Sequence, residues 1–423
     1  MREMKDSGVE WIGEIPVDWE LSKIGSVYDE RNEKVSDKDF APLSVTKQGI
    51  VPQLETAAKT DNGDNRKLIR KNDFVINSRS DRRGSCGISE YDGSCSLINT
   101  VLKPQTNMCN RYYGFVFKSD SFADEYYRWG HGIVDDLWST KWTDMKSIYI
   151  PAPNIVEQEK IADYLDVKCS KIDEIIAKQQ AIIEKLKEYK LSVITEAVTK
   201  GVNPDVEMKN SGYEYIGDIP IYWNVCRLRN YGSAQNGISK GGEYFGTGYP
   251  FVSYGDVYRN YALPNVVDGL IKTTEEERKK YSVKEGDIFF TRTSETIEEV
   301  GFSAVCNKTI PNATYAGFVI RVRPFIDMLM LGFAKYYFRS KHLRVYFAKE
   351  MNLVTRASLG QDLLKSMPLL VPPKDEQYKI AEYLDKKCNL IDSNIYEKGR
   401  LIDKLQEYKK SLIYEVVTGK KEV

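Results

Sequence analysis

The feature that most constrains this chain is a segment of 43 residues that occurs twice. Residues 157–199 and 376–418 align without a gap at an offset of 219, and 24 of the 43 positions are identical. Internal repetition of this kind predicts that one structural unit is used twice and stacked or paired with itself. Every other feature of the sequence is placed relative to this repeat.

Both copies have apolar residues at the spacing of a long helix that packs against a partner. Steps of seven residues select Leu165, Ile172, Gln179, Leu186 and Val193 in the first copy, and Leu384, Ile391, Lys398, Leu405 and Leu412 in the second. Gln179 and Lys398 are polar breaks at the same level, and such breaks commonly set register. We therefore predict a coiled coil of two helices, each roughly 60 Å long at about 1.5 Å per residue. The alternative, two unrelated amphipathic helices, leaves their matching surface residues unexplained.

A shorter repeat opens each half of the chain. Residues 5–19 read KDSGVEWIGEIPVDW and residues 209–223 read KNSGYEYIGDIPIYW. The Ser-Gly turn and the aromatic–aliphatic run are typical of a structured docking strip rather than a linker. Each half is therefore expected to consist of a strip, a variable block and a long helix.

The variable blocks diverge in sequence but keep landmarks in the same order. The β-prone run 72–79 corresponds to 286–292, and 101–104 corresponds to 321–324. Proline-punctuated runs end the blocks at 150–153 and 370–373, where they stop a strand before the long helix. Short strands, glycine-rich turns and a few helices predict an α+β fold that is used twice.

Composition and absent motifs limit the chemistry of the chain. Seven scattered cysteines predict reduced thiols and a cytoplasmic location, and the polar N-terminus is not that of a signal peptide. With two histidines, little material is present for metal or acid–base catalysis. There is no phosphate-binding loop, no dinucleotide fingerprint and no CxxC pair. The sequence therefore favours a protein that is not itself an enzyme and that binds no metal or cofactor.

Basic residues gather locally although the formal net charge is zero. Residues 66–83 have a local charge of +5 and residues 321–349 a local charge of +6. Lysine and arginine neutralise DNA phosphates, while arginine and amide side chains can read base edges. The candidate DNA contacts are Lys47, Gln48, Arg66, Lys67, Arg70, Asn77, Ser78, Arg79, Arg82, Arg83, Lys141, Trp142, Ser253, Tyr254, Arg292, Thr293, Ser294, Thr355 and Arg356. A solvated surface charge is the simpler interpretation for any one of them, and their recurrence at equivalent places favours DNA contact for the set.

The tandem plan resembles the specificity subunit of type I restriction–modification systems. The most specific marks are the Pro-x-x-x-Glu-Gln-x-x-Ile-Ala-x-Tyr-Leu-Asp motifs that begin at Pro153 and Pro372, together with the two strips. The resemblance implies two target-recognition domains, each reading one half of an asymmetric DNA site, held apart by two antiparallel helices. It also implies docking of two modification (methyltransferase) subunits. S-adenosylmethionine, ATP and Mg²⁺ are then expected only in the modification and restriction subunits.

These inferences give one expected organisation, an α+β chain with an internal pseudo-two-fold repeat. The expected parts are a docking strip (1–19), recognition domain 1 (20–151), a central helix (152–200), a linker with the second strip (201–223), recognition domain 2 (224–371) and a C-terminal helix (372–423). The expected partners are double-stranded DNA and the modification and restriction subunits, with no membrane. Two alternatives remain open at this point: a nuclease or methyltransferase with unfamiliar motifs, and a coiled-coil adaptor that binds only proteins.

Overall fold

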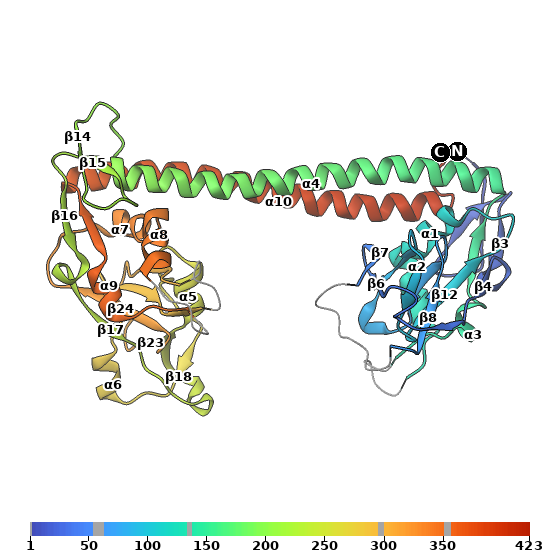
Figure 1. The fold of residues 1–423 in the computed structure, drawn as a ribbon, viewed down its shortest axis with the longest axis horizontal. Coiled ribbons are helices and arrows are strands. Elements are labelled where there is room, and N and C mark those ends of the chain that lie inside the picture. Colours follow the sequence, from blue (N-terminus) through green and yellow to red (C-terminus); the bar gives the residue numbers. More distant parts are fainter. Residues whose placement is uncertain (1, 54–62, 133–137, 295–299, 351–356) are drawn as a thin grey trace. The chain divides into compact units, whose positions relative to one another are not determined.

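The computed structural model describes residues 2–53, 63–132, 138–294, 300–350 and 357–423 (Figure 1). The chain divides into two compact units: unit 1 comprises Met1–Gln180 and Gly399–Val423, and unit 2 comprises Ala181–Lys398. Two long helices, α4 (Ile155–Lys200) and α10 (Lys374–Val417), each contribute one part to each unit. Each unit therefore contains one variable block and one part of each long helix.

A four-stranded antiparallel sheet with the same strand order lies at the centre of each unit. In unit 1 the order is β10 (Cys86–Ile88), β9 (Phe74–Asn77), β12 (Asn99–Pro104) and β4 (Tyr28–Glu30). In unit 2 it is β22 (Ser303–Val305), β20 (Ile288–Thr291), β24 (Val319–Pro324) and β17 (Gly232–Asn236). The shared order confirms the prediction that one α+β fold is used twice.

The outer strands differ between the units. Unit 1 has a sheet of β11 (Gly93–Cys95), β8 (Arg66–Ile69) and β5 (Lys34–Val35), and a hairpin of β6 (Leu43–Thr46) and β7 (Gly49–Pro52). Unit 2 has β19 (Leu270–Ile271), β18 (Phe245–Val252) and β23 (Thr314–Tyr315), with β18 parallel to β23, and the pair β21 (Thr293–Ser294) and β25 (Ala357–Ser358). The two variable blocks therefore share the central sheet and differ in the strands around it.

Two-stranded pairs and short helices frame each sheet (Figure 1). The strips form the hairpins β1 (Met4–Asp6) with β2 (Glu14–Pro16) and β14 (Met208–Asn210) with β15 (Asp218–Pro220). The first and last strands of the blocks pair as β3 (Glu20–Lys23) with β13 (Tyr149–Ala152) and β16 (Asn224–Arg227) with β26 (Pro368–Val371). The helices are α1 (Asn110–Lys118), α2 (Asp120–Arg128) and α3 (Trp142–Met145) in unit 1, and α5 (Tyr254–Arg259), α6 (Glu275–Lys280), α7 (Leu331–Tyr337), α8 (Lys341–Glu350) and α9 (Gln361–Ser366) in unit 2. Single 3₁₀ turns are η1 (Ile24–Ser26), η2 (Ser80–Arg82), η4 (Leu228–Asn230) and η5 (Gly242–Tyr244).

Aromatic side chains fill the cores and join the sheets to the helices. In unit 1 Phe117 of α1 packs against Phe74 of β9 and Phe122 of α2, with ring centroids 4.8 and 4.7 Å apart. In unit 2 the core that contains β20 and β24 also contains Ile194 of α4 and Leu384 of α10. The long helices are therefore part of the hydrophobic core of unit 2, and removing them would expose apolar surface.

Both long helices end at a glycine with left-handed backbone. Gly201 follows α4 with φ of +78°, and Gly419 lies just beyond α10 with φ of +73°. Glycine is the residue that adopts this conformation without a steric penalty, so it commonly ends helices. Since Gly201 and Gly419 are offset by 218 residues rather than 219, the two copies slip by one residue at this point.

Two equivalent ion pairs show how the long helices run. In unit 1 Lys409 Nζ of α10 lies 2.6 Å from Asp173 Oδ2 of α4, and in unit 2 Lys190 Nζ of α4 lies 2.7 Å from Asp392 Oδ2 of α10. Within unit 1 the early part of α4 meets the late part of α10, and within unit 2 the reverse holds. The helices are therefore antiparallel, as the resemblance implied.

The heptad positions of both helices lie on the packed side. Leu165, Ile172, Val193, Leu384, Ile391 and Leu412 are buried, and Leu186 and Leu405 are half-buried. Gln179 and Lys398 are half-buried, and each is the twenty-fifth residue of its helix counted from Ile155 and Lys374. The division between the two units falls within two residues of both polar breaks. That these breaks fix the register stays a prediction.

The Glu-Gln motif at the start of each long helix joins three parts of the fold. Glu157 accepts a hydrogen bond from Trp19 Nε1 at 3.0 Å, and Glu376 accepts one from Trp223 Nε1 at 2.9 Å. Gln158 and Gln377, the residues that follow, each donate to a proline carbonyl at 2.8 Å. Gln158 also accepts from Cys109 N at 2.9 Å, and Gln377 accepts from Met330 N at 2.7 Å. The motif therefore ties strip, variable block and helix together in both halves.

Three further features bear on the expected chemistry. All seven cysteines lie within the described residues and are free thiols. Among the residues that the structure describes, no three or more His, Cys, Asp or Glu side chains are grouped so that they could hold a metal ion. No helix in the same residues combines the length and apolarity needed to span a membrane.

Candidate nucleic-acid interface

The arginine-bearing segment that follows β9 forms a turn on unit 1. We call residues 78–83 of unit 1 and residues 292–294 of unit 2 the arginine turns. Ser78 N donates to the Ile98 carbonyl at 3.2 Å, and the Ser78 carbonyl accepts from Thr140 N at 3.0 Å. An isolated antiparallel bridge joins Arg79 to Ser139. The turn is therefore held between the loop before β12 and the segment before α3.

The arginine turn of unit 2 is held by the same set of backbone bonds. Arg292 N donates to the Phe318 carbonyl at 2.8 Å, and the Arg292 carbonyl accepts from Leu359 N at 2.7 Å. Thr293 pairs with Ser358 in the short ladder of β21 and β25. Phe318 precedes β24 as Ile98 precedes β12, so the two turns occupy equivalent places in the repeated fold.

The backbone bonds also locate the counterparts of Lys141 and Trp142. Ser139 and Ser358 bridge the two arginine turns in the same way, so the residues that match Lys141 and Trp142 are Gly360 and Gln361. Thr355 and Arg356, the candidates that precede the final strand of unit 2, lie outside the described residues, as does the side chain of Ser294.

Arg339 and Arg344 fix the backbone near the arginine turn of unit 2. Arg339 donates to the carbonyls of Ser303 at 2.6 Å and of Val257 at 2.7 Å, and Arg344 donates to the Gly301 carbonyl at 2.5 Å. Their guanidinium carbons lie 5.0 and 4.9 Å from the centroid of the Phe302 ring. Burial lowers the pKa of Arg339 to about 10 and, with the nearby charge of Arg339, that of Arg344 to about 9. Both remain charged at neutral pH and serve to position β22 and the end of α5.

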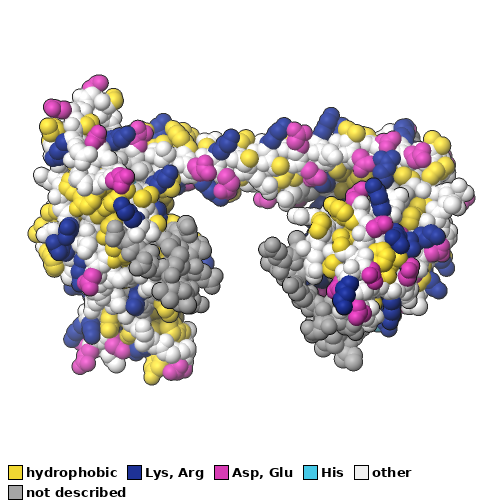
Figure 2. Space-filling model, in the orientation of Figure 1, with side chains coloured by type: hydrophobic (Ala, Val, Ile, Leu, Met, Phe, Trp, Pro, Cys, Tyr) yellow, Lys and Arg dark blue, Asp and Glu magenta, His cyan; other side chains and the backbone are white. Residues whose placement is uncertain are grey.

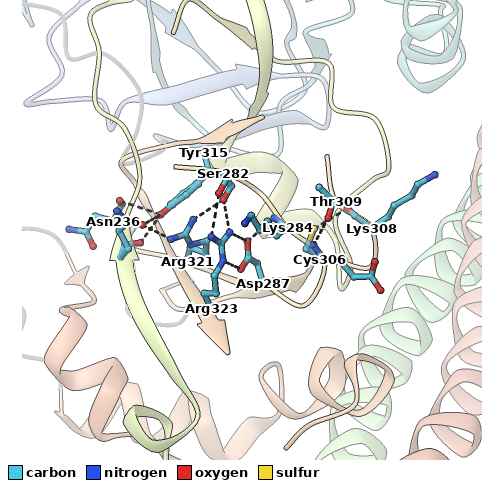
Figure 3. A network of polar contacts seen from close by, with 12 residues as sticks. Asn236, Ser282, Lys284, Asp287, Cys306, Lys308, Thr309, Tyr315, Arg321 and Arg323 are labelled. Atoms are coloured by element: carbon cyan, nitrogen blue, oxygen red, sulfur yellow. Dashed lines mark hydrogen bonds and ion pairs between the residues drawn. The ribbon is translucent and has the colours of Figure 1, made fainter. Parts of the chain in front are cut away.

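A second polar network joins β20, β24 and β17 in unit 2 (Figure 3). Arg323 makes a bidentate ion pair with Asp287, with Nε–Oδ1 and Nη2–Oδ2 distances of 2.7 and 2.6 Å. Arg321 donates to the Ser282 carbonyl at 2.7 Å and stacks over Tyr315 with 5.3 Å to the ring centroid. Burial lowers the pKa of Arg321, whereas the hydrogen bond to Asp287 raises that of Arg323. These arginines stabilise the sheet and are not available to a ligand.

The basic run 321–349 is therefore mainly structural, and its local charge was misleading. Besides the four arginines described above, Lys335 Nζ lies 2.6 Å from Asp385 Oδ1 of α10. A cluster of charges in sequence is not a cluster on the surface when alternate residues of a strand and one face of a helix point inward. Of this run, Lys341 and Lys349 remain exposed.

Three of the candidate contacts in unit 1 are corrected for the same reason. Arg66 is 5% exposed and donates to Ser94 Oγ at 2.8 Å, and Lys67 is buried beside Glu30 with an Nζ–Oε1 distance of 3.2 Å. Asn77 is buried, and its Oδ1 accepts from Arg79 N at 3.1 Å. Strand β8 is covered on both faces, so its side chains cannot reach DNA. Asn77 instead shapes the arginine turn.

Several other candidates make intramolecular contacts that position the site. Arg70 lies over the Phe40 ring at 5.1 Å and Arg83 pairs with Asp124 of α2 at 2.5 Å. Ser253 caps α5 in a reciprocal pair with Asp256, and Tyr254 stacks on Tyr258. These four candidate side chains are nevertheless exposed or half-buried, as are Lys47, Gln48, Ser78, Arg79, Arg82, Lys141, Trp142, Arg292 and Thr293. Their contact with DNA stays a prediction.

The sequence interpretation missed Ile98 and Phe318, the exposed residues whose carbonyls hold the arginine turns. A phenylalanine beside a strand is usually a core residue, so no sequence signal separated Phe318 from its buried neighbours. Figure 2 shows lysine and arginine interspersed with aspartate and glutamate over the visible face of the protein. Basic and acidic side chains therefore alternate on the visible face, rather than forming one large basic patch.

Comparison with known proteins connects this architecture to one family. The family model of the type I restriction modification DNA specificity domain matches residues 16–188 and 223–405. The chain belongs to this family. The two matched segments each contain one central sheet and one arginine turn, so a type I specificity domain is present twice. The chain is thus a DNA-specificity subunit and not a catalytic one.

Relatives of the same type are similar over most of their length. The EcoKI specificity subunit of Escherichia coli strain K12 is 24% identical over 366 residues, which cover 83% of this chain and 75% of that protein. The putative MjaX specificity subunit of Methanocaldococcus jannaschii is 24% identical over 445 aligned positions, covering 97% of this chain and 95% of that protein. Both relatives are named as specificity subunits of type I restriction enzymes.

Solved structures share the fold at lower identity. A chain from a structure of an assembled type I restriction–modification system has a TM-score of 0.71 at 15% identity, with 95% of this chain and 98% of that chain covered. The HsdS subunit from Thermoanaerobacter tengcongensis has a TM-score of 0.53 at 15% identity, with 96% and 98% covered. The type I specificity fold therefore extends over nearly the whole chain.

Proposed function

We propose that this specificity subunit reads a bipartite, asymmetric site on double-stranded DNA. The block 20–151 would read one half-site and the block 224–371 the other. For two readers on one face of the duplex, the half-sites should lie about one helical turn apart. The chain would do no chemistry on the DNA itself.

The observation that carries this proposal is the arginine turn, which recurs with the same backbone bonds in both units. Arg79 is exposed and Arg292 is half-buried, at neighbouring positions of the repeated turn, and arginine can donate two parallel hydrogen bonds to a guanine edge. Backbone hydrogen bonds hold both turns in place, whereas the side chains on the turns differ between the units. A rigid scaffold with variable side chains is suited to reading different bases in the two half-sites.

The long helices would set the spacing of the half-sites and dock two modification subunits together with restriction subunits. Each helix is bound to its strip through Trp19–Glu157 or Trp223–Glu376, and the two strips would serve as equivalent docking surfaces. S-adenosylmethionine, ATP and Mg²⁺ would bind only in those partner subunits. The complex would act in the cytoplasm, where its DNA substrate lies.

Selection of binding sites tests the proposal directly. The full chain in complex with its modification subunits is incubated with a random duplex library, and bound sequences are determined. We expect one bipartite site with a fixed spacer, and the same site in the methylome of a host that expresses the complex. Replacing residues 20–151 by the equivalent block of another specificity subunit should change one half-site only.

Two results would contradict the proposed function. One is recovery of no bipartite sequence by the wild-type complex, with binding that depends on salt but not on sequence. The other is a block replacement that alters both half-sites together, because the two readers would then not be independent.

A further inference from the structure

An exposed apolar side chain borders the arginine turn in both units. Phe318 is 63% exposed and its carbonyl accepts the hydrogen bond of Arg292 N at 2.8 Å. At the equivalent position of unit 1, Ile98 is 37% exposed, and its carbonyl accepts from Ser78 N at 3.2 Å and from Ser78 Oγ at 2.5 Å. The arginine turn of each unit therefore has a large apolar neighbour that faces solvent.

The turn that carries Phe318 is held by several bonds and by close packing. Val319 N donates to the Ala316 carbonyl at 2.9 Å, and Ala316 N donates to the Val252 carbonyl at 3.0 Å. A Cβ atom on Gly317 would lie 2.2 Å from Ser239 Oγ, so a larger residue there would force the Ser239 side chain to move. Tyr315, which precedes this turn, belongs to the network drawn in Figure 3 and packs under Arg321. Phe318 is therefore presented from a fixed backbone position.

The turn of unit 1 has the same internal bond although its sequence differs. Asn99 N donates to the Ser96 carbonyl at 3.0 Å, as Val319 N does to Ala316. Leu97, which lies between Ser96 and Ile98, is also exposed. Both blocks thus keep an exposed apolar residue at one place of the repeat, while the residue itself changes from isoleucine to phenylalanine.

We propose that Phe318 is a specificity-determining residue that contacts a thymine methyl group in the half-site read by unit 2, with Ile98 as its counterpart in unit 1. This inference rests on the proposed function. Hydrogen bonds from arginine identify guanine, whereas the thymine methyl is recognised by apolar contact in the major groove. An arginine turn bordered by an apolar side chain offers both kinds of contact to adjacent base pairs. The exposed ring gains a buried apolar contact on binding, which favours association.

The experiment compares three variants of the full chain in complex with its modification subunits. The variants are F318A, F318L and F325A, and the matched control Phe325 is 66% exposed after the other end of β24. The two phenylalanines are seven positions apart, about 23 Å at roughly 3.3 Å per residue of strand. Random-duplex selection is run on each complex, and thermal unfolding checks that each variant is folded.

We expect wild type and F325A to select the same bipartite site. F318A should lose the preference for one thymine–adenine pair of the unit 2 half-site, with about tenfold weaker binding of the wild-type site. The other half-site should be unchanged, and F318L should be intermediate. Replacing that thymine by uracil should weaken binding to wild type several-fold and leave binding to F318A unchanged.

The inference is overturned if the wild-type complex selects a bipartite site and F318A selects the same one. It is equally overturned if the affected position is not a thymine–adenine pair, or if F325A has the same effect. If the wild-type complex selects no bipartite site, the proposed function fails before Phe318 is tested. The two failures are therefore distinguishable.

Discussion

At the scale of single residues, equivalent carboxylates stabilise both units with different partners. Asp73 and Asp287 precede β9 and β20, and each accepts from the backbone N–H three residues earlier at 2.8 Å. Asp73 binds Arg31, which follows β4, whereas Asp287 binds Arg323 of β24. Both units have a buried carboxylate at this position, but the arginine that neutralises it comes from a different strand or loop in each unit.

Removing the Asp287 carboxylate should therefore be costly. The D287A variant leaves Arg323 without its ion-pair partner in the protein interior, and we expect a loss of about 3 kcal/mol in the unfolding free energy. Urea-induced unfolding measures this loss. Asp81 is a suitable control because its pair with Arg82 is exposed, so D81A should change stability by less than about 0.5 kcal/mol.

His342 should make stability depend on pH. Its side chain is 2% exposed, and burial, helped by the charge of Arg344, lowers its pKa from 6.5 to about 3. In the unfolded chain it takes up a proton near pH 6.5, so below that pH the unfolded state binds more protons and stability falls. Between pH 7 and pH 5 the loss from this residue should be about 2 kcal/mol.

The test compares how steeply the free energy of unfolding changes with pH in wild type and in a variant. H342Q should unfold with a shallower dependence between pH 7 and pH 5, whatever its stability at pH 7. His131 is the other histidine of the chain and is exposed, so H131Q serves as the matched control substitution. Equal slopes for wild type and H342Q would show that the ring is already protonated or hydrated in the folded state.

At the scale of elements, the pairing of α4 with α10 combines an apolar stripe with specific ion pairs. Asp173–Lys409 and Lys190–Asp392 are related by the 219-residue offset, so the same pair is made once in each unit. The apolar stripe would tolerate a shift along the helix axis by one heptad. The charge pairs add a preference for one register.

Exchanging the charges of one pair tests this contribution. D392K places two lysines together and should destabilise the protein by about 0.5 kcal/mol, and the double variant K190D/D392K should recover most of that loss. A double-mutant cycle in thermal unfolding measures the coupling. The pair Asp173–Lys409 provides an internal control, since the same cycle there should give a similar coupling energy. A coupling energy of zero in both pairs would mean that the apolar stripe alone sets the register.

At the scale of the whole molecule, each long helix is continuous through the division between the two units. Gln179 and Lys398 lie beside that division, in the middle of their helices. A change of length made there alters neither variable block. The spacing function proposed for the helices can therefore be tested apart from base recognition.

Deleting residues 176–182 and 395–401 removes one heptad from both helices at equivalent positions. Each helix becomes about 10 Å shorter, which corresponds to about three base pairs at 3.4 Å each. Random-duplex selection should return the same two half-sites with a spacer shorter by about that number. Altered half-sites with an unchanged spacer would contradict the proposed role of the helices.

Much of the architecture was readable from the sequence because repeats and heptads are patterns along one dimension. The offset of 219 residues, the strips and the Glu-Gln motif predicted two copies of one fold and two long paired helices. Periodicity is enough for such elements, since the apolar spacing alone decides which face of a helix is buried. The family resemblance followed from the same segments.

Which charges face solvent was decided only by the tertiary structure. Arg66 and Arg79 belong to one basic run, yet Arg66 is buried beside Ser94 while Arg79 is exposed on the arginine turn. Likewise Phe318 is exposed and Phe289 is buried in the same sheet region. Burial depends on pairing between strands that are distant in sequence, such as β9 with β12 and β20 with β24. Local composition does not determine that pairing, so the sequence alone could not tell which residues of the variable blocks are exposed.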